Sequence, residues 1–296
     1  MPGNPCPEGP GGLLRAFAGH AAVAGLEALR AAPPALSRSA LGALLPAYPR
    51  LRPAHARHLA ALFAASPFAE ELTLQAYYRA RLDLLLRNLQ VHGRPVSEAF
   101  PQVEVEGKET YARALARGRP VALLGLHAGP LELLHRLPET PTGRPFALVA
   151  APAFAPALTG WLAAGREREG KRMARTGVRG DQGLLVALRA VLEARGVLAV
   201  MVDQHPGSAD AHEILTLWGR IQSPYPGRLL RLLERRGCVF VPVSVRLKDS
   251  GACFRYHGIW DGAGPERVRT FLEEAIASAP IQWNWSYPKL GVAPVT

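Results

Sequence analysis

Two residues near the middle of the chain have the types and spacing for acid–base chemistry. His127 directly follows the apolar run 120–126, and Glu132 comes five positions later, after Pro130. Proline at this place is typical of the first turn of a helix. A histidine at the end of a strand and a carboxylate one turn into the next helix can face each other, so we expect Glu132 to accept a hydrogen bond from one imidazole nitrogen. The other nitrogen would then deprotonate a substrate hydroxyl.

Free backbone amides around Gly129, at the expected start of that helix, would hold a developing oxyanion. The alternative for the whole segment is a histidine that merely ends a strand, with an unrelated glutamate on the helix surface. The spacing of His127 and Glu132 alone does not decide between these two interpretations.

A second group of polar residues, Asp203-Gln204-His205, follows the apolar run 196–202. Polar residues at the ends of two parallel strands belong to the same edge of a sheet, so we expect this group beside His127. Further possible metal ligands follow closely; the candidate set for a metal-dependent hydrolase is Asp203, His205, Asp210 and His212, with Glu213 next to it. Their spacing fits no compact metal motif, and a metal site is the less favoured interpretation.

A third group is basic and lies between the first two. It comprises Arg166, Arg168, Lys171, Arg172, Arg175 and Arg179. One interpretation is a solvated helix end and loop. The other is a surface that binds phosphate, an acidic carrier protein or anionic lipid.

The pattern along the chain predicts an α/β fold with a mostly parallel central sheet flanked by helices, preceded by an N-terminal helical segment. Short apolar runs alternate with helical periodicity after residue 93, which is typical of parallel strands joined by helical crossovers. The expected strands are 120–126, 146–150, 197–202, 238–245 and 253–259, and the expected helices are 131–137, 155–168, 183–195, 226–236 and 266–277. We divide the chain into a disordered tail (1–12), a helical region (13–92, with a last helix at 70–88) and an α/β domain (93–296).

Composition narrows the classes of partner. The net charge is +11, and because Lys occurs at only four positions, 31 of the 35 basic residues are Arg, which favours phosphate and carboxylate partners. No nucleic-acid-binding motif is present, so we do not expect nucleic acid as a partner. There is no signal-peptide pattern and no apolar run long enough to span a membrane, and the three dispersed cysteines favour a reducing compartment. Serine-hydrolase, P-loop and dinucleotide-binding motifs are missing as well.

An ordered series of segments resembles the bacterial lipid A biosynthesis acyltransferase family. The segments are HAGPLE (127–132), APALTGWLAAGR (155–166), VDQHPG (202–207), VFVPVSVR (239–246) and IQWNWSYPKL (281–290). The same family pattern includes phosphatidylinositol mannoside acyltransferases, and it is similar to the wider group of lysophospholipid and glycerol-phosphate acyltransferases. The likeness runs from about residue 93 to residue 290.

The resemblance implies transfer of a fatty acyl group from acyl carrier protein or coenzyme A to a hydroxyl of a glycolipid or phospholipid. His127 matches the family's catalytic base and Glu132 its acidic partner in the His-x4-Glu motif. Arg166 and Asp203 match residues that support the substrate or the site, and Gln204 and Gly129 join them as expected substrate-binding residues. The mechanism implied requires no metal and no cofactor beyond the thioester co-substrate.

The resemblance also implies a peripheral location on the cytoplasmic face of the inner membrane, with an anionic membrane surface as a partner. Two alternatives stay open at this point. One is the metal-dependent hydrolase named above, and the other is a catalytically inactive lipid-binding homologue.

Overall fold

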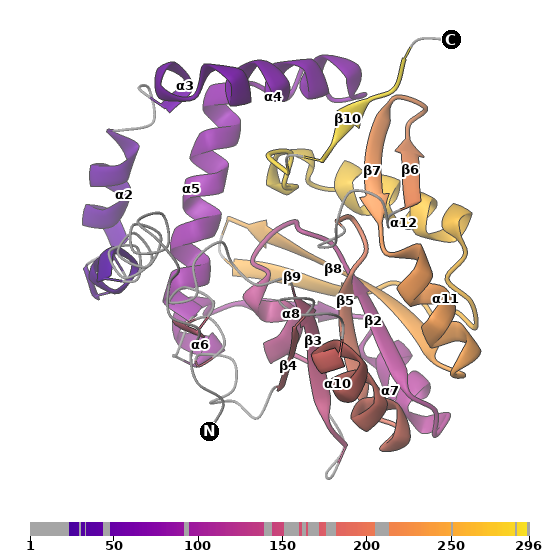
Figure 1. Ribbon diagram of the computed structural model, residues 1–296. Helices are drawn as coiled ribbons and strands as arrows, with labels where there is room; N and C mark the ends of the chain where they lie inside the picture. Colours follow the sequence, from indigo (N-terminus) through magenta and orange to yellow (C-terminus); the bar gives the residue numbers. More distant parts are fainter. Residues whose placement is uncertain are drawn as a thin grey trace, which may run out of the picture.

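The computed structural model describes most of the 296-residue chain (Figure 1). The described residues are 24–29, 31–32, 34–43, 48–91, 95–138, 144–150, 160–161, 164, 172–175, 182–204, 213–249, 251–287 and 289–294. The predicted tail (1–12) and most of the predicted helix 155–168 lie outside these ranges.

A seven-stranded sheet forms the centre of the molecule, in the order β1-β9-β8-β2-β5-β3-β4. Five of its six strand pairs are parallel, and only β8 and β9 are antiparallel. The strands are β1 (Val103–Glu106), β2 (Val121–Gly125), β3 (Phe146–Ala150), β4 (Arg172–Arg175), β5 (Val197–Met201), β8 (Val239–Lys248) and β9 (Gly251–Tyr256). The predicted α/β class with a mostly parallel sheet is therefore confirmed.

Alternate residues of the central strands pack into two separate cores, one on each face of the sheet. In β2, Ala122 and Leu124 join one core, whereas Val121 and Leu123 join the other. The first core includes α10 (Gln182–Glu193), α11 (Gly227–Arg235) and α12 (Pro265–Ala277), and the second includes α6 (Val96–Ala99), α7 (Lys108–Ala116) and α8 (Glu132–Arg136). Strands buried on both faces have no polar side, which explains why their sequences are continuous apolar runs.

The N-terminal helices pack beside this α/β unit. They are α2 (Pro34–Gly42), α3 (Tyr48–Leu51), α4 (Pro53–Ala65) and the long α5 (Leu74–Val91), which corresponds to the helix predicted at 70–88. Apolar side chains of α4 and α5, among them Leu59, Phe63 and Tyr77, belong to the same core as α10–α12. Within the described ranges, no helix combines the length and hydropathy of a membrane-spanning segment.

A small antiparallel sheet of β10 (Gly291–Val292), β7 (Ile221–Tyr225) and β6 (Glu213–Leu217) was not predicted from sequence. Its hairpin turns at Trp218 and Gly219, both with positive φ, and the Arg220 N–H donates to the Leu217 carbonyl. Such turns usually carry Asn-Gly, so Trp-Gly left no recognisable signal. Edge strand β4 was not predicted either, because a segment with Arg172 and Arg175 is typical of a helix end and loop.

Candidate active site

His127 and Asp203 meet because their strands are neighbours in register. In the parallel pair β2–β5, Gly125 lies opposite Met201. His127 and Asp203 each come two residues after these positions, so both emerge at the carboxyl edge of the sheet on adjacent strands. This edge is where parallel sheets place their functional groups.

Asp203 is fully buried and accepts three hydrogen bonds through its carboxylate. The His127 Nδ1–H donates to Oδ1 at 2.9 Å, while the His127 backbone N–H and the Trp283 Nε1–H each donate to Oδ2 at 2.8 Å. A buried carboxylate needs such donors to replace the water it has lost. Its backbone carbonyl is held too, by the hydroxyl of Ser223 at 3.1 Å.

These bonds determine the protonation pattern of the imidazole. Because a carboxylate only accepts hydrogen bonds, the proton of the neutral His127 ring resides on Nδ1 and the lone pair on Nε2. The side chain is 25% exposed, and Nε2 has no hydrogen-bond partner within the described part of the chain. His127 is thus held in one orientation, with an accessible Nε2 whose lone pair can accept a proton.

The C-terminal segment holds the loop that carries His127. The Asn284 N–H donates to the His127 carbonyl at 2.8 Å, and Ala128 forms a β-bridge with Trp283. Trp283 therefore contacts the loop of His127 through its backbone and the carboxylate of Asp203 through its indole. Although 281–290 was recognised as a motif, a role for Trp283 was missed, since nothing in its local pattern points to Asp203.

Gly129 is the residue that lets this loop pass close to β8. Its φ is +64°, and a Cβ built at this position would lie 2.2 Å from the carbonyl oxygen of Val245. Only glycine adopts this conformation without strain and fits this gap. The helix that follows, α8, has only five residues, so the loop is positioned mainly by its contacts with β8 and the Trp283 segment.

Glu132 is placed differently from the sequence expectation. His127 Nδ1 is hydrogen bonded to Asp203, whereas Glu132 Oε2 lies 3.3 Å from Nε2 of His135, one helical turn away in α8. Residues three apart share a face of a helix, and both side chains are almost completely buried. The Glu132 N–H also donates to Asn88 Oδ1 at 3.3 Å, which ties α8 to α5. The sequence predicted that one imidazole nitrogen of His127 would bind Glu132; in the structure Nδ1 binds Asp203.

The remaining predicted residues are only partly described. Gln204 follows Asp203 at the same edge, and its buried side-chain nitrogen has no hydrogen-bond partner within the described residues. Arg166 lies outside the described residues, as do Arg168, Lys171 and Arg179, and for Arg172 and Arg175 only the backbone of β4 is described.

The metal-site alternative also falls largely outside the described ranges, since His205, Asp210 and His212 are not included. Asp203 uses both carboxylate oxygens for the hydrogen bonds given above. Among the described residues, one compact group of potential metal ligands occurs on β1 and β9, and it consists of Glu104, Glu106 and Cys253. Lys248 and Arg255 already pair with its two carboxylates.

A model of the bacterial lipid A biosynthesis acyltransferase family matches residues 13–290 of the chain. The chain belongs to this family. The match covers both the N-terminal helical region and the α/β unit, and it confirms the family expected from the ordered motifs. Comparison with curated proteins finds no match. In this lipid A acyltransferase family member, the candidate site brings together His127, the buried Asp203 and Trp283 from three distant segments.

Proposed function

We propose that the protein transfers a fatty acyl group from acyl carrier protein or coenzyme A to a hydroxyl of a glycolipid or phospholipid, with His127 as the general base. Family membership supports lipid acyl transfer as the class of activity. The single observation that carries the assignment of the base is the hydrogen bond from His127 Nδ1 to buried Asp203, which leaves Nε2 to accept a proton.

The proposed reaction needs no covalent enzyme intermediate. Nε2 of His127 accepts the proton of the acceptor hydroxyl as its oxygen attacks the thioester carbonyl carbon. The tetrahedral intermediate collapses with cleavage of the carbon–sulfur bond, and the leaving thiolate takes the proton from Nε2. Asp203 stabilises the transient imidazolium by charge and by the hydrogen bond to Nδ1.

Gln204, Gly129 and Arg166 are proposed to bind substrate. The buried amide nitrogen of Gln204 lacks a partner in the described residues, and buried donors without partners are unusual in proteins. A carbonyl or hydroxyl oxygen of the substrate would satisfy it. Arg166 would contribute charge toward a phosphate or the developing oxyanion, as its match to the family motif implies.

Glu132 is proposed to support the site through α8 and not through Nδ1 of the base. Its carboxylate contacts His135 and its N–H is bound by Asn88, so it links the segment after His127 to α5. The proposed location is a peripheral one, on the cytoplasmic face of the inner membrane, where an acidic carrier or anionic lipid would meet the Arg-rich chain.

The decisive experiment incubates the purified protein with acyl-coenzyme A or acyl carrier protein of several chain lengths and a bacterial lipid extract. We expect free thiol and a newly acylated lipid to appear in equal amounts, by thiol assay and mass spectrometry. His127→Ala should abolish both signals with its thermal unfolding unchanged, and Asp261→Asn, a control at an exposed carboxylate, should retain them. Release of fatty acid without acylated lipid would instead identify a hydrolase. Full activity of His127→Ala would contradict the proposal. Loss of the parent chain's activity on adding EDTA would contradict it as well.

A further inference from the structure

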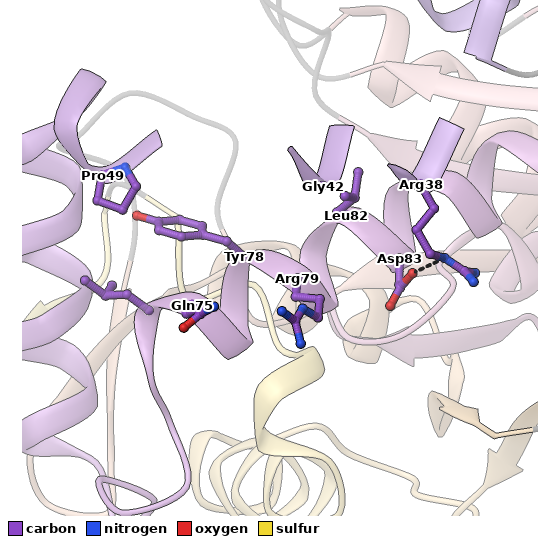
Figure 2. A pocket seen from close by; sticks show the side chains of 9 residues that line it. Arg38, Gly42, Pro49, Gln75, Tyr78, Arg79, Leu82 and Asp83 are labelled. Atoms are coloured by element: carbon purple, nitrogen blue, oxygen red, sulfur yellow. Dashed lines mark ion pairs between the residues drawn. The ribbon is translucent and has the colours of Figure 1, made fainter. Parts of the chain in front are cut away.

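The N-terminal helices border a partly open cavity whose lining contains none of the residues of the proposed active site. Its volume is about 600 Å³, within the range of roughly 300–1,000 Å³ that is usual for small-molecule sites. It lies between α2, the start of α3 and one face of α5 (Figure 2). The lining residues are Arg38, Gly42, Pro49, Leu74, Gln75, Tyr78, Arg79, Leu82 and Asp83.

The lining divides into an apolar part and a charged part. Pro49, Leu74, Tyr78 and Leu82 supply apolar surface, and the latter three lie four residues apart along α5. Arg79 and the Arg38–Asp83 pair supply the charges, as seen in Figure 2. A site with an apolar wall and separate charged groups suits an amphiphilic ligand, because each part of the ligand meets a matching surface.

The balance of charge in the cavity is positive. Arg38 Nε lies 3.0 Å from Asp83 Oδ1, and the Arg38 side chain is 55% exposed, so its remaining guanidinium donors are available to a second anion. Among the described residues, Arg79 has no carboxylate partner. A guanidinium without a partner beside apolar surface favours a phosphate or carboxylate group, which it binds through two parallel hydrogen bonds.

We propose that this cavity binds a single-chain amphiphile with an anionic head group, the head at Arg79 and Arg38 and the chain against Leu74, Tyr78 and Leu82. A fatty acid and a lysophospholipid share this chemistry. The proposal concerns binding alone and does not require the acyl-transfer reaction.

One route connects the cavity with the loop of His127. Tyr78 lines the cavity, while the adjacent Tyr77 lies about 100° further around α5 and its hydroxyl accepts a hydrogen bond from the Ser286 N–H at 3.0 Å. Ser286 Oγ donates to Asn284 Oδ1, and the Asn284 N–H donates to the His127 carbonyl. A ligand in the cavity would therefore contact α5, the helix whose Tyr77 holds the C-terminal segment next to His127.

Two substitutions test the two parts of the cavity separately. Gly42 lines the cavity, and a Cβ added there would meet no atom within 4 Å, so Gly42→Leu is chosen to occupy part of the space. Gly25 offers the same open surroundings in the short helical stretch 24–29, which precedes α2, and this makes Gly25→Leu its matched control. Arg79→Glu reverses the charge at the proposed head-group site, and Arg81→Glu makes the same change on α5 outside the cavity lining.

Binding is measured by titration calorimetry of the full chain with octyl phosphate below its micelle concentration, and with octanoate, octyl glucoside and inorganic phosphate. We expect saturable binding of octyl phosphate or octanoate, and the tighter of the two identifies the head group. Arg79→Glu and Gly42→Leu should each weaken it by at least about tenfold, whereas Arg81→Glu and Gly25→Leu stay within about twofold of the parent chain. His127→Ala should bind like the parent, which separates this site from the proposed active site.

Two results would overturn the proposal. One is equal binding of octyl glucoside and octyl phosphate, since the anionic head would then contribute nothing. The other is an affinity in Arg79→Glu or Gly42→Leu that equals that of its matched control.

Discussion

The indole N–H of Trp283 donates a hydrogen bond to the buried carboxylate of Asp203 at 2.8 Å, on the oxygen that also accepts the backbone N–H of His127. The other oxygen holds the imidazole Nδ1. Since buried polar groups that are fully hydrogen bonded are rigid, this arrangement keeps the His127 ring in one orientation and one tautomer.

Trp283→Phe should lower kcat by roughly tenfold and change KM little, because it loosens Asp203 while leaving the aromatic packing in place. Trp285→Phe is the matched control: its indole donates to the Pro280 carbonyl and not to Asp203. Steady-state acyl-transfer rates of both variants check this. Equal effects of the two substitutions would show that Trp283 acts only by packing.

Asp203→Asn should lower kcat by about 10²–10⁴-fold. The amide cannot accept at both positions, so the imidazole loses its fixed tautomer and the charge that stabilises the imidazolium. The measurement is kcat for the variant, with circular dichroism to confirm folding. Activity close to that of the parent chain would remove Asp203 from the mechanism.

Gly129→Ala should reduce both stability and activity, since a Cβ here meets the Val245 carbonyl in addition to the strain of positive φ. Gly219 has a similar φ of +68° with nothing within 4 Å of an added Cβ. Gly219→Ala should therefore lower the free energy of unfolding only by the strain of the positive φ, about 1 kcal/mol. Its activity should be normal. Urea unfolding and kcat for both variants separate the effect of the close contact from that of the backbone conformation.

Glu132→Gln should lower the free energy of unfolding by about 1–3 kcal/mol, because it removes the charge that faces buried His135. Its kcat should fall less than that of Asp203→Asn, as His127 keeps its Nδ1 partner. Glu193→Gln, in the exposed pair with Arg189, is expected to change stability by less than about 1 kcal/mol. If Glu132→Gln were as inactive as Asp203→Asn but fully stable, Glu132 would act on the imidazole itself.

Stability should decrease as the pH falls below 6.5, in part because of His257. Burial lowers the pKa of this histidine to about 4, with a further contribution from Arg255. Between pH 6.5 and 4 the unfolded chain binds a proton that the folded protein does not, so folding is increasingly opposed in this range, by up to about 3 kcal/mol. Above pH 6.5 both states are neutral and the effect vanishes.

Urea unfolding at pH 7 and pH 4.5 tests this. His257→Gln, which keeps a group able to hydrogen bond with Ser244 Oγ, should lose less stability between the two values than the parent chain. The same loss in both proteins would assign the acid sensitivity to other groups.

Much of the fold could be predicted because its central strands are buried on both faces. Continuous apolar runs such as 121–125 and 197–201 are visible in sequence, and the alternation with helices implies parallel order. Strands with weaker patterns were missed, including β4 with two arginines and the β6–β7 hairpin, whose turn carries Trp218 where asparagine is usual. The intrinsic strand propensity of a segment predicts its structure poorly where pairing with neighbouring strands determines that structure.

The sequence by itself determined the family, the fold class and the position of His127, since motifs and strand ends are local properties of the chain. Only the tertiary structure decided that Asp203 binds the His127 ring and Trp283 binds Asp203, while Glu132 faces His135. The physical reason is that these contacts join distant parts of the chain. Strand register brings Asp203 to His127, 76 positions away, and the packing of the C-terminal segment brings Trp283 to Asp203, 80 positions away. A spacing of five residues can suggest a partner for His127, but the in-register pairing of β2 with β5 supplies a nearer one.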